Sequence, residues 1–228
     1  MIWVFHKVSP ADLKPDPVRF YSRGPKLWVK RTLRRVYSEL FGYQFRLPSQ
    51  WWVTDDYFRV KLEEAAAYEV VPLREYTDPS TQLVISFDGI YENVYLFALP
   101  LLSDFDYPFE LFVTARHVGH HNSFDSLEPL ARFANWDQLQ AMAARGGRLQ
   151  YHSRSHPDLT TLDPARLEEE VRPAFACEFF AYPYGRFNSE VVQMVSRHYR
   201  GDVAMVGGDG SRFQLRRVEV CHERRLLL

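Results

Sequence analysis

Short apolar segments alternate with segments of helical periodicity along most of this 228-residue chain. The clearest apolar segment is Leu83–Phe87, whose composition suits a strand that is covered on both faces. Because strands and helices alternate in this way, the chain predicts a parallel α/β arrangement. We expect one domain over residues 1–228, since no internal repeat or low-complexity tract divides the sequence.

The predicted elements recur at intervals that suit repeated strand–helix units. Strands are predicted at residues 2–5, 69–73, 83–87, 109–113, 149–151, 179–182 and 202–206. Helices are predicted at 57–68, 93–104 and 136–145, from Pro164 onward, and from a Ser189 cap to Arg197. In a (β/α) barrel, the residues that follow the strands gather on the active-site face.

The composition narrows the classes of partner and compartment. A net charge of −1 gives no reason to propose nucleic acid as a partner. Aromatic residues make up 15% of the chain, which suits stacking on sugar rings or a thick core. Cys177 and Cys221 are too few for a disulfide framework, and the apolar run at residues 2–5 is too short for a signal peptide. We therefore expect a cytoplasmic protein.

Residues 26–41 predict a helix with apolar side chains on one side and lysines and arginines on the other. A solvated surface helix explains this pattern. A basic amphipathic helix that rests on anionic membrane or lipid phosphates explains it too, and would place the protein at the inner face of the membrane. We treat the segment as a basic helical insertion in the domain.

Three short polar or aromatic segments follow predicted strands. Asp88 could be a general base or a strand-end cap. His152 and His156 lie four residues apart, so both rings could face one divalent ion, although two surface histidines would share this spacing. Tyr184 lies in a Pro-Tyr-Gly turn that could form a wall and an oxyanion donor. Together these are the parts of a hydrolytic site.

This ordered set of motifs resembles the polysaccharide deacetylase family, also called carbohydrate esterase family 4. The motifs are Ser86-Phe87-Asp88-Gly89, Trp136-Asp137-Gln138-Leu139, His152-Ser153-Arg154-Ser155-His156, Phe180-Ala181-Tyr182-Pro183-Tyr184-Gly185 and Arg217-Val218-Glu219-Val220. The likeness runs from Val4 to about Val220, nearly the whole chain. It implies a distorted (β/α) barrel of seven or eight strands.

The resemblance also implies roles for individual residues. Asp88 would be the catalytic base, and the backbone N–H of Tyr184 would face the oxyanion. His222, by position only, is the candidate acid. The substrate-binding candidates are Phe180, Tyr182 and His6.

Three positions depart from the family pattern. Gly89 stands where family members carry a metal-binding aspartate, and Ala181 replaces the arginine that orients the base. The late segment that carries a catalytic histidine in the family is not recognisable, and His222 is the nearest candidate. These departures leave the metal site incomplete.

A divalent metal, with zinc as the expected ion, is predicted at His152 and His156. Catalytic zinc usually has three protein ligands. The candidates for the third ligand are Asp88, Glu92, His6 and His117. The alternative is a metal-free site in which a histidine polarises water together with Asp88.

The sequence predicts a carbohydrate amidase that removes an acetyl or formyl group from an amino sugar during surface polysaccharide assembly, such as that of O-antigen. A cytoplasmic enzyme would act on a nucleotide-linked or lipid-linked sugar. Two alternatives remain open: a catalytically silent saccharide-binding or scaffold protein, and a metal-free amidohydrolase that acts on a non-sugar amide. The specific sugar and the oligomeric state cannot be read from these residues.

Overall fold

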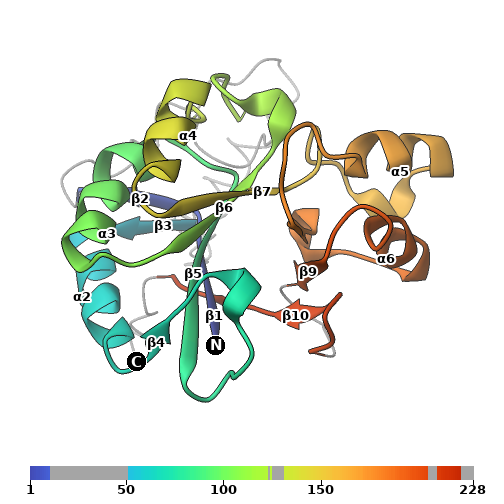
Figure 1. Cartoon of the computed structure of the whole chain (residues 1–228). Helices are drawn as coiled ribbons and strands as arrows, with labels where there is room; N and C mark the ends of the chain where they lie inside the picture. The colour runs from blue at the N-terminus through green and yellow to red at the C-terminus, as the bar shows by residue number, and fades with distance from the viewer. Residues whose placement is uncertain (11–50, 123, 125–130, 205–209, 222–228) are drawn as a thin grey trace, which may run out of the picture.

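The computed structural model describes residues 1–10, 51–122, 124, 131–204 and 210–221. The basic segment at 26–41 lies outside these residues. Within them, nine parallel strands form one sheet in the order β10-β9-β8-β7-β6-β5-β1-β11, with β4 beside β5 (Figure 1). The strands are β1 (Ile2–Phe5), β4 (Glu69–Val70), β5 (Gln82–Asp88), β6 (Phe109–Val113), β7 (Gly147–Tyr151), β8 (Phe179–Ala181), β9 (Gly201–Ala204), β10 (Leu215–Arg216) and β11 (Val218–Glu219).

One short stretch of chain joins the two edges of this sheet. β10 pairs with β9 through Arg216 and Ala204, and β11 pairs with β1 through Val218 and Trp3. Between them, the N–H of Arg217 donates to the carbonyl of Ala204 at 3.0 Å. Because the same stretch pairs with both edges, the sheet curls into a nearly closed barrel. The prediction of a distorted (β/α) barrel is therefore confirmed.

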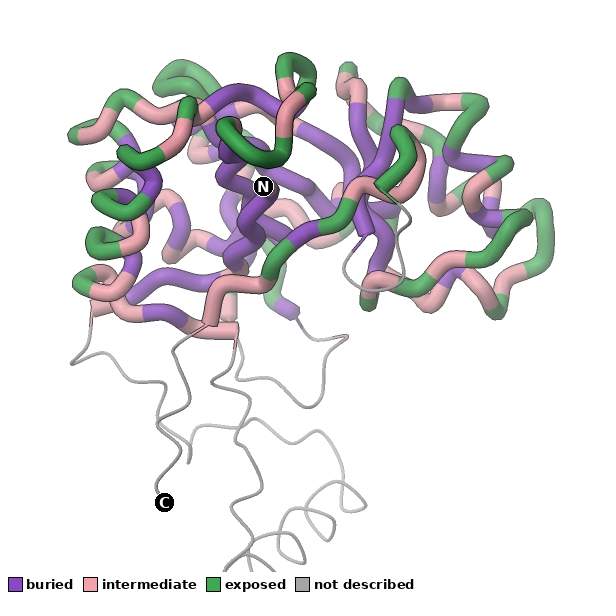
Figure 2. Tube along the Cα trace, turned by 90° about the horizontal axis from the view of Figure 1, so that it is seen from below, coloured by how far each residue is buried: buried purple, intermediate pink, exposed green. Residues whose placement is uncertain are grey.

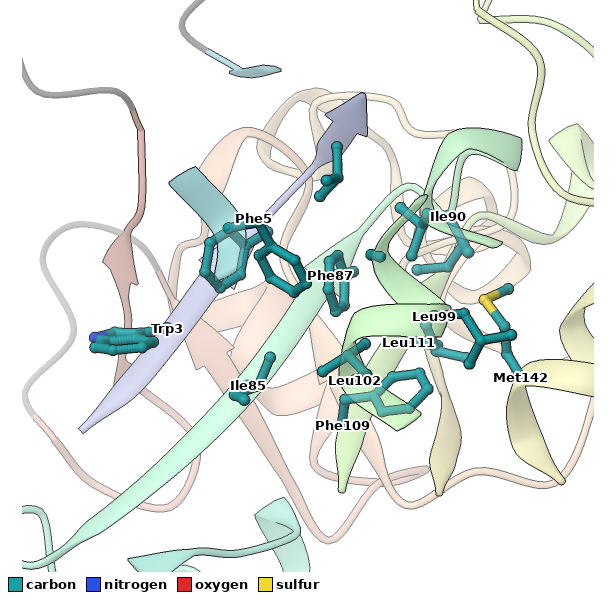
Figure 3. Close-up of a cluster of buried hydrophobic side chains, with 14 of the residues drawn as sticks. Trp3, Phe5, Ile85, Phe87, Ile90, Leu99, Leu102, Phe109, Leu111 and Met142 are labelled. Carbon is teal, nitrogen blue, oxygen red and sulfur yellow. The ribbon is translucent and has the colours of Figure 1, made fainter. Parts of the chain in front are cut away.

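Helices pack on the outside of the barrel (Figure 1). Two hydrophobic clusters hold them there, one under α2, α3 and α4 against β1, β5 and β6, and one under α5 and α6 against β8. Figure 3 shows the first cluster, in which side chains of the three strands face those of α3 and α4. The helices are α2 (Asp55–Ala65), α3 (Leu99–Phe105), α4 (Trp136–Ala143), α5 (Pro164–Val171) and α6 (Ser189–Val195), and a π-helical turn at Val94–Ala98 leads into α3.

A third cluster fills the barrel itself. It contains the apolar side chains that alternate with those of the outer clusters along each strand, including Ile2, Val84, Phe112 and Val203. Figure 2 shows the result from below, with buried parts of the chain in the middle and exposed residues on the outer turns. The barrel end beyond this cluster is where the strands end and polar side chains begin.

Local sequence explains most helix starts. Asn135 and Gln138 form a reciprocal capping box at the start of α4, and Asp163 caps α5 ahead of Pro164. The prediction that Ser189 caps the helix at 189–197 is wrong: the cap is Asn188, whose side chain accepts from the N–H of Val191 at 2.9 Å. None of the helices in the described ranges is long and apolar enough to cross a membrane.

The sequence patterns missed the shortest strands. β10 and β11 contain two residues each, too few to show an alternating pattern. The pair of β2 (Lys7–Ser9) and β3 (Trp52–Thr54) was missed for the same reason, and it forms a separate two-stranded sheet. The strand predicted at 69–73 is shorter than expected, since β4 ends at Val70 and Leu73 begins a 3₁₀ turn.

Candidate active site

Asp88 is the last residue of β5 and lies buried at the end of the barrel where the parallel strands finish. Both its carboxylate oxygens accept hydrogen bonds from the guanidinium of Arg217, each at 2.6 Å. Burial alone would raise the pKa of Asp88, but the positive charge of Arg217 holds this pKa well below its usual range. Asp88 is therefore ionised and held in one orientation.

Arg217 is a site residue whose role the sequence did not reveal. Its side chain is buried, it lies between β10 and β11, and it joins the last strand to Asp88 on β5. The resemblance places an arginine that orients the base at the position of Ala181, and here a different arginine makes that contact. The sequence pointed to Arg217 only through its match to the family's closing motif. That match did not predict a contact with Asp88.

His152 follows β7, and hydrogen bonding fixes its tautomer. Its Nδ1 lies 2.8 Å from the carbonyl oxygen of Ala181. Because a carbonyl can only accept, Nδ1 must carry the proton, which leaves Nε2 as the acceptor of the neutral ring. Burial lowers the pKa of His152, so the ring is neutral at pH 7.

His156 lies beside His152, with the ring centroids 4.8 Å apart and the ring planes at 74°. The four-residue spacing is realised in a loop, not a helix, and His156 itself has a positive φ of 65°. Its Nδ1 is buried and has no hydrogen-bond partner among the described residues. Burial, and then the neighbouring His152, lower the pKa of His156 well below its usual value.

These two rings fit two of the ligand positions of a divalent ion. Both are neutral, and the bond from His152 to a backbone carbonyl is the support that metal-ligating histidines usually have. A third ligand does not join them: within the described ranges, no group of three His, Cys, Asp or Glu residues could hold an ion. Asp88 is committed to Arg217, and Gly89 has no donor.

The other candidates for a third ligand have partners of their own. Glu92 accepts from the side chain of Gln138 at 3.0 Å. The Nε2 of His117 lies 3.3 Å from the carbonyl of Ser155. His6 follows β1 and its ring contacts that of Trp51, with centroids 4.5 Å apart. Burial is the main cause that lowers the pKa of His6 to about 3, so this ring is neutral as well.

Gly89 is placed where a side chain would meet aromatic rings. Its φ is +57°, a conformation that favours glycine. A Cβ there would lie 3.4 Å from Cε1 of Phe133 and 3.5 Å from Cε2 of Tyr91, whose rings stack on each other. These are ordinary van der Waals distances, so the positive φ of Gly89, rather than lack of space, disfavours a side chain beside Asp88.

Tyr184 lies at the rim of the site. Its φ is +58°, its side chain is 56% exposed, and its ring centroid lies 4.7 Å from that of His156. The guanidinium carbon of Arg186 lies 6.0 Å from the centroid of this ring. An exposed aromatic ring beside the two imidazoles is suited to contact a sugar.

The structure places Phe180 and Tyr182 in the hydrophobic cluster under α5 and α6, where both are buried. The hydroxyl of Tyr182 donates to Asp202 at 2.5 Å. Both aromatic side chains therefore pack in the core. They do not form the exposed wall of the site that the sequence led us to expect. His222 lies outside the described residues.

Comparison with known proteins bears on the family and the fold. A sequence profile described as polysaccharide deacetylase matches residues 75–199, more than half of the chain. The chain is 25% identical over 174 residues to YxkH of Bacillus subtilis (strain 168), whose name carries the same family. That match covers 72% of this chain and 58% of the length of YxkH.

Solved structures share the fold at low sequence identity. The deacetylase PplD of Streptococcus pyogenes, described in complex with acetate, aligns with a TM-score of 0.67 and 18% identity, over 96% of this chain and 91% of PplD. IcaB from Ammonifex degensii aligns with a TM-score of 0.65 and 17% identity, over 97% and 91% of the two chains. With its profile match and its barrel, the chain belongs to the polysaccharide deacetylase family.

Proposed function

We propose that this protein is a hydrolase that removes an N-acyl group, in the first instance acetyl, from an amino sugar. The observation that carries the proposal is the meeting of Asp88, ionised and held by Arg217, with the neutral rings of His152 and His156. The negative charge of Asp88 raises the pKa of both imidazoles, against the larger effect of burial, and this supports a shared site for the three groups. Family membership and the likeness to PplD, described with bound acetate, support the same reaction class.

In the proposed mechanism, Asp88 accepts a proton from the attacking water. Arg217 takes one lone pair of each carboxylate oxygen, and a second pair on each oxygen remains to accept from water. The water oxygen bonds to the amide carbon, and the carbonyl π electrons move onto the oxygen. Arg217 is a positioning residue here, because it holds the base without touching the substrate.

The oxyanion that forms would be stabilised by the backbone N–H of Tyr184, whose ring lies beside that of His156 and whose φ is positive. A divalent ion, with zinc as the expected one, would be held by His152 and His156 and would supply Lewis-acid polarisation of the amide carbonyl. His6 and the exposed ring of Tyr184 are the proposed substrate contacts.

The finer features of the substrate are proposed from the sequence alone. We expect a nucleotide-linked or lipid-linked amino sugar used in surface polysaccharide assembly, such as that of O-antigen, in a cytoplasmic setting. The basic segment at 26–41 would contact anionic membrane if the donor is lipid-linked.

The direct test is acetate release from an oligomer of N-acetylglucosamine by purified wild type and by Asp88→Asn. Loss of the base is expected to lower kcat/KM by about 10²–10⁴-fold. The matched control is Asp104→Asn, an exposed carboxylate that lies 3.6 Å from Arg59 on the outside of the barrel. Circular dichroism checks that the variants fold. Equal turnover by wild type and folded Asp88→Asn would refute the assignment.

A further inference from the structure

Glu219 lies on β11 and faces the barrel interior beside the Asp88–Arg217 pair. Alternate residues of a strand point to the same face. Arg217 points inward to Asp88, and Val218 between the two is 50% exposed. Glu219 therefore points inward as well, and its strand partner on β1 is the fully buried Val4.

Among the described residues, the carboxyl group of Glu219 forms no ion pair, although the charge of Arg217 acts on it. Its Oε1 is buried and makes no hydrogen bond within the described ranges. Both terminal nitrogens of Arg217, which lies between β10 and β11, donate to Asp88. The described charged or titratable groups at this end of the barrel include Asp88 at the end of β5, which is negative, His6 after β1, which is neutral, and the buried Lys7 beside His6.

These surroundings shift the pKa values of the two carboxyl groups, Glu219 and Asp88, in opposite directions. Burial, and then the negative charge of Asp88, raise the pKa of Glu219 to about 7, against the opposing effect of Arg217. The pKa of Asp88 is lowered by the charge of Arg217. Glu219 therefore carries a proton up to neutral pH, while Asp88 does not. Two carboxyl groups with opposite shifts are the usual arrangement of an acid and a base in one site.

We propose that Glu219 is the catalytic acid, the residue that protonates the leaving amine nitrogen. This inference rests on the proposed amide hydrolysis. In the tetrahedral intermediate, the oxyanion re-forms the carbonyl, the C–N bond breaks, and the nitrogen takes the proton of Glu219. The proton that Asp88 took from water then passes through solvent to Glu219. The products are acetic acid, which loses its proton to solvent as acetate, and the free amino sugar, and both carboxyl groups regain their starting states.

The test compares two leaving groups. Glu219→Gln is assayed on an N-acetylglucosamine oligomer and on 4-nitrophenyl acetate, whose phenolate leaves without a proton. Loss of a proton donor is expected to lower kcat/KM for the amide by about 10²–10⁴-fold and to change ester hydrolysis by less than about threefold. A structural role would lower both rates by the same factor, and that result would overturn the assignment.

A second measurement needs no variant. Because the acid form of Glu219 is the active one, kcat/KM for the amide should fall as pH rises through about 7. The ester rate of the same wild-type protein should show no fall there. Identical pH profiles for the two substrates would contradict the proposal even if Glu219→Gln fails to fold.

The matched control is Glu110→Gln. Glu110 is a second buried carboxyl group inside the barrel with a raised pKa, but it accepts from the N–H of Leu73 at 2.8 Å and from Gln150 at 2.7 Å. We expect this variant to keep both the pH profile and the ratio of amide to ester rates. Wild type that hydrolyses neither substrate would refute the proposed function, whereas equal losses in Glu219→Gln would refute only the role of Glu219.

Discussion

The candidate site has two sides that are built by different forces. On the carboxylate side, Asp88 and Arg217 are both buried and are joined by two charged hydrogen bonds, while the Nε of Arg217 has no partner among the described residues. On the imidazole side, His152 and His156 are neutral, and the Nδ1 of His156 is left without a partner among the described residues. The first side is fixed by charge, and the second by ring packing and one bond to the backbone.

Because of this difference, the carboxylate side should contribute mainly to the stability of the fold and the imidazole side mainly to ligand binding. Removing one member of a buried ion pair strongly destabilises the fold, because the remaining charge stays buried without a partner. A neutral ring with an unused nitrogen contributes little hydrogen bonding to the folded state, so that nitrogen is available to a ligand. Substitutions on the carboxylate side should therefore destabilise the fold, and those on the imidazole side should mainly reduce function.

The largest expected effect is on the stability of the carboxylate side. Asp88→Asn and Arg217→Met should each lower the free energy of unfolding by about 3–5 kcal/mol, since each leaves one member of the pair without its partner. The double variant should be less destabilised than the sum of the two, as measured by urea denaturation. The control is the exposed pair of Arg59 and Asp104, where the same cycle should be additive. Additive losses at the buried pair would contradict the comparison.

On the imidazole side, His156→Gln should lower kcat/KM for acetate release by about 10²-fold. The free energy of unfolding should change by less than about 1 kcal/mol, because Nδ1 of His156 makes no hydrogen bond in the described part of the chain. Added zinc should raise the Tm of wild type and not of this variant, since an ion that binds only the folded state stabilises it. His198→Gln, on the outside of the barrel beside Glu168, is the control. A zinc effect of equal size in His156→Gln would place the ion elsewhere.

Acid should weaken the fold in a defined pH window. The pKa of His6 is lowered from 6.5 to about 3, so the unfolded chain binds a proton that the folded one does not. Stability is fully present above 6.5 and is lost as pH falls toward 3, by at most about 1.4 kcal/mol per pH unit for this histidine. Urea midpoints measured between pH 7 and 4 test this expectation. His6→Gln should flatten the dependence, and an unchanged slope in that variant would exclude His6 as its source.

The smallest effect is expected at the rim. Tyr184→Ala removes an exposed ring that packs beside His156, so the fold should be unaffected. If the ring stacks on the sugar, its loss removes about 0.5–1.5 kcal/mol of binding and raises KM by less than about tenfold, with kcat unchanged. The control is Tyr184→Phe, which keeps the ring and should behave as wild type. A fall in kcat in Tyr184→Ala without a change in KM would assign the side chain a different role.

Much of the barrel could be predicted from the sequence, because its strands are carried by local patterns. The prediction at 109–113 coincides with β6, and the turn chemistry of Asp163 and Pro164 marked the start of α5. The three motifs after the strands also marked Asp88 and the two histidines before their geometry was known. Strands and helix starts depend mainly on residues that are close together in the chain. The pattern of apolar residues therefore predicts them.

The closing strand could not be predicted in this way. β10 and β11 are too short for a pattern, and Arg217 is 129 residues away from Asp88 in the sequence. The same holds for Phe180 and Tyr182, whose aromatic side chains suit a sugar wall or a core equally well. Only packing under α5 and α6 decides that both are buried.

Local patterns and motifs in the chain were enough to predict the family, the barrel and the identity of Asp88, His152 and His156 as polar residues that follow strands. The tertiary structure alone decided that Arg217 holds Asp88 and that Glu219 faces the same interior. The physical reason is that an ion pair or a shifted carboxyl group depends on burial and on charges from distant strands, and neither is encoded in residues adjacent in the chain.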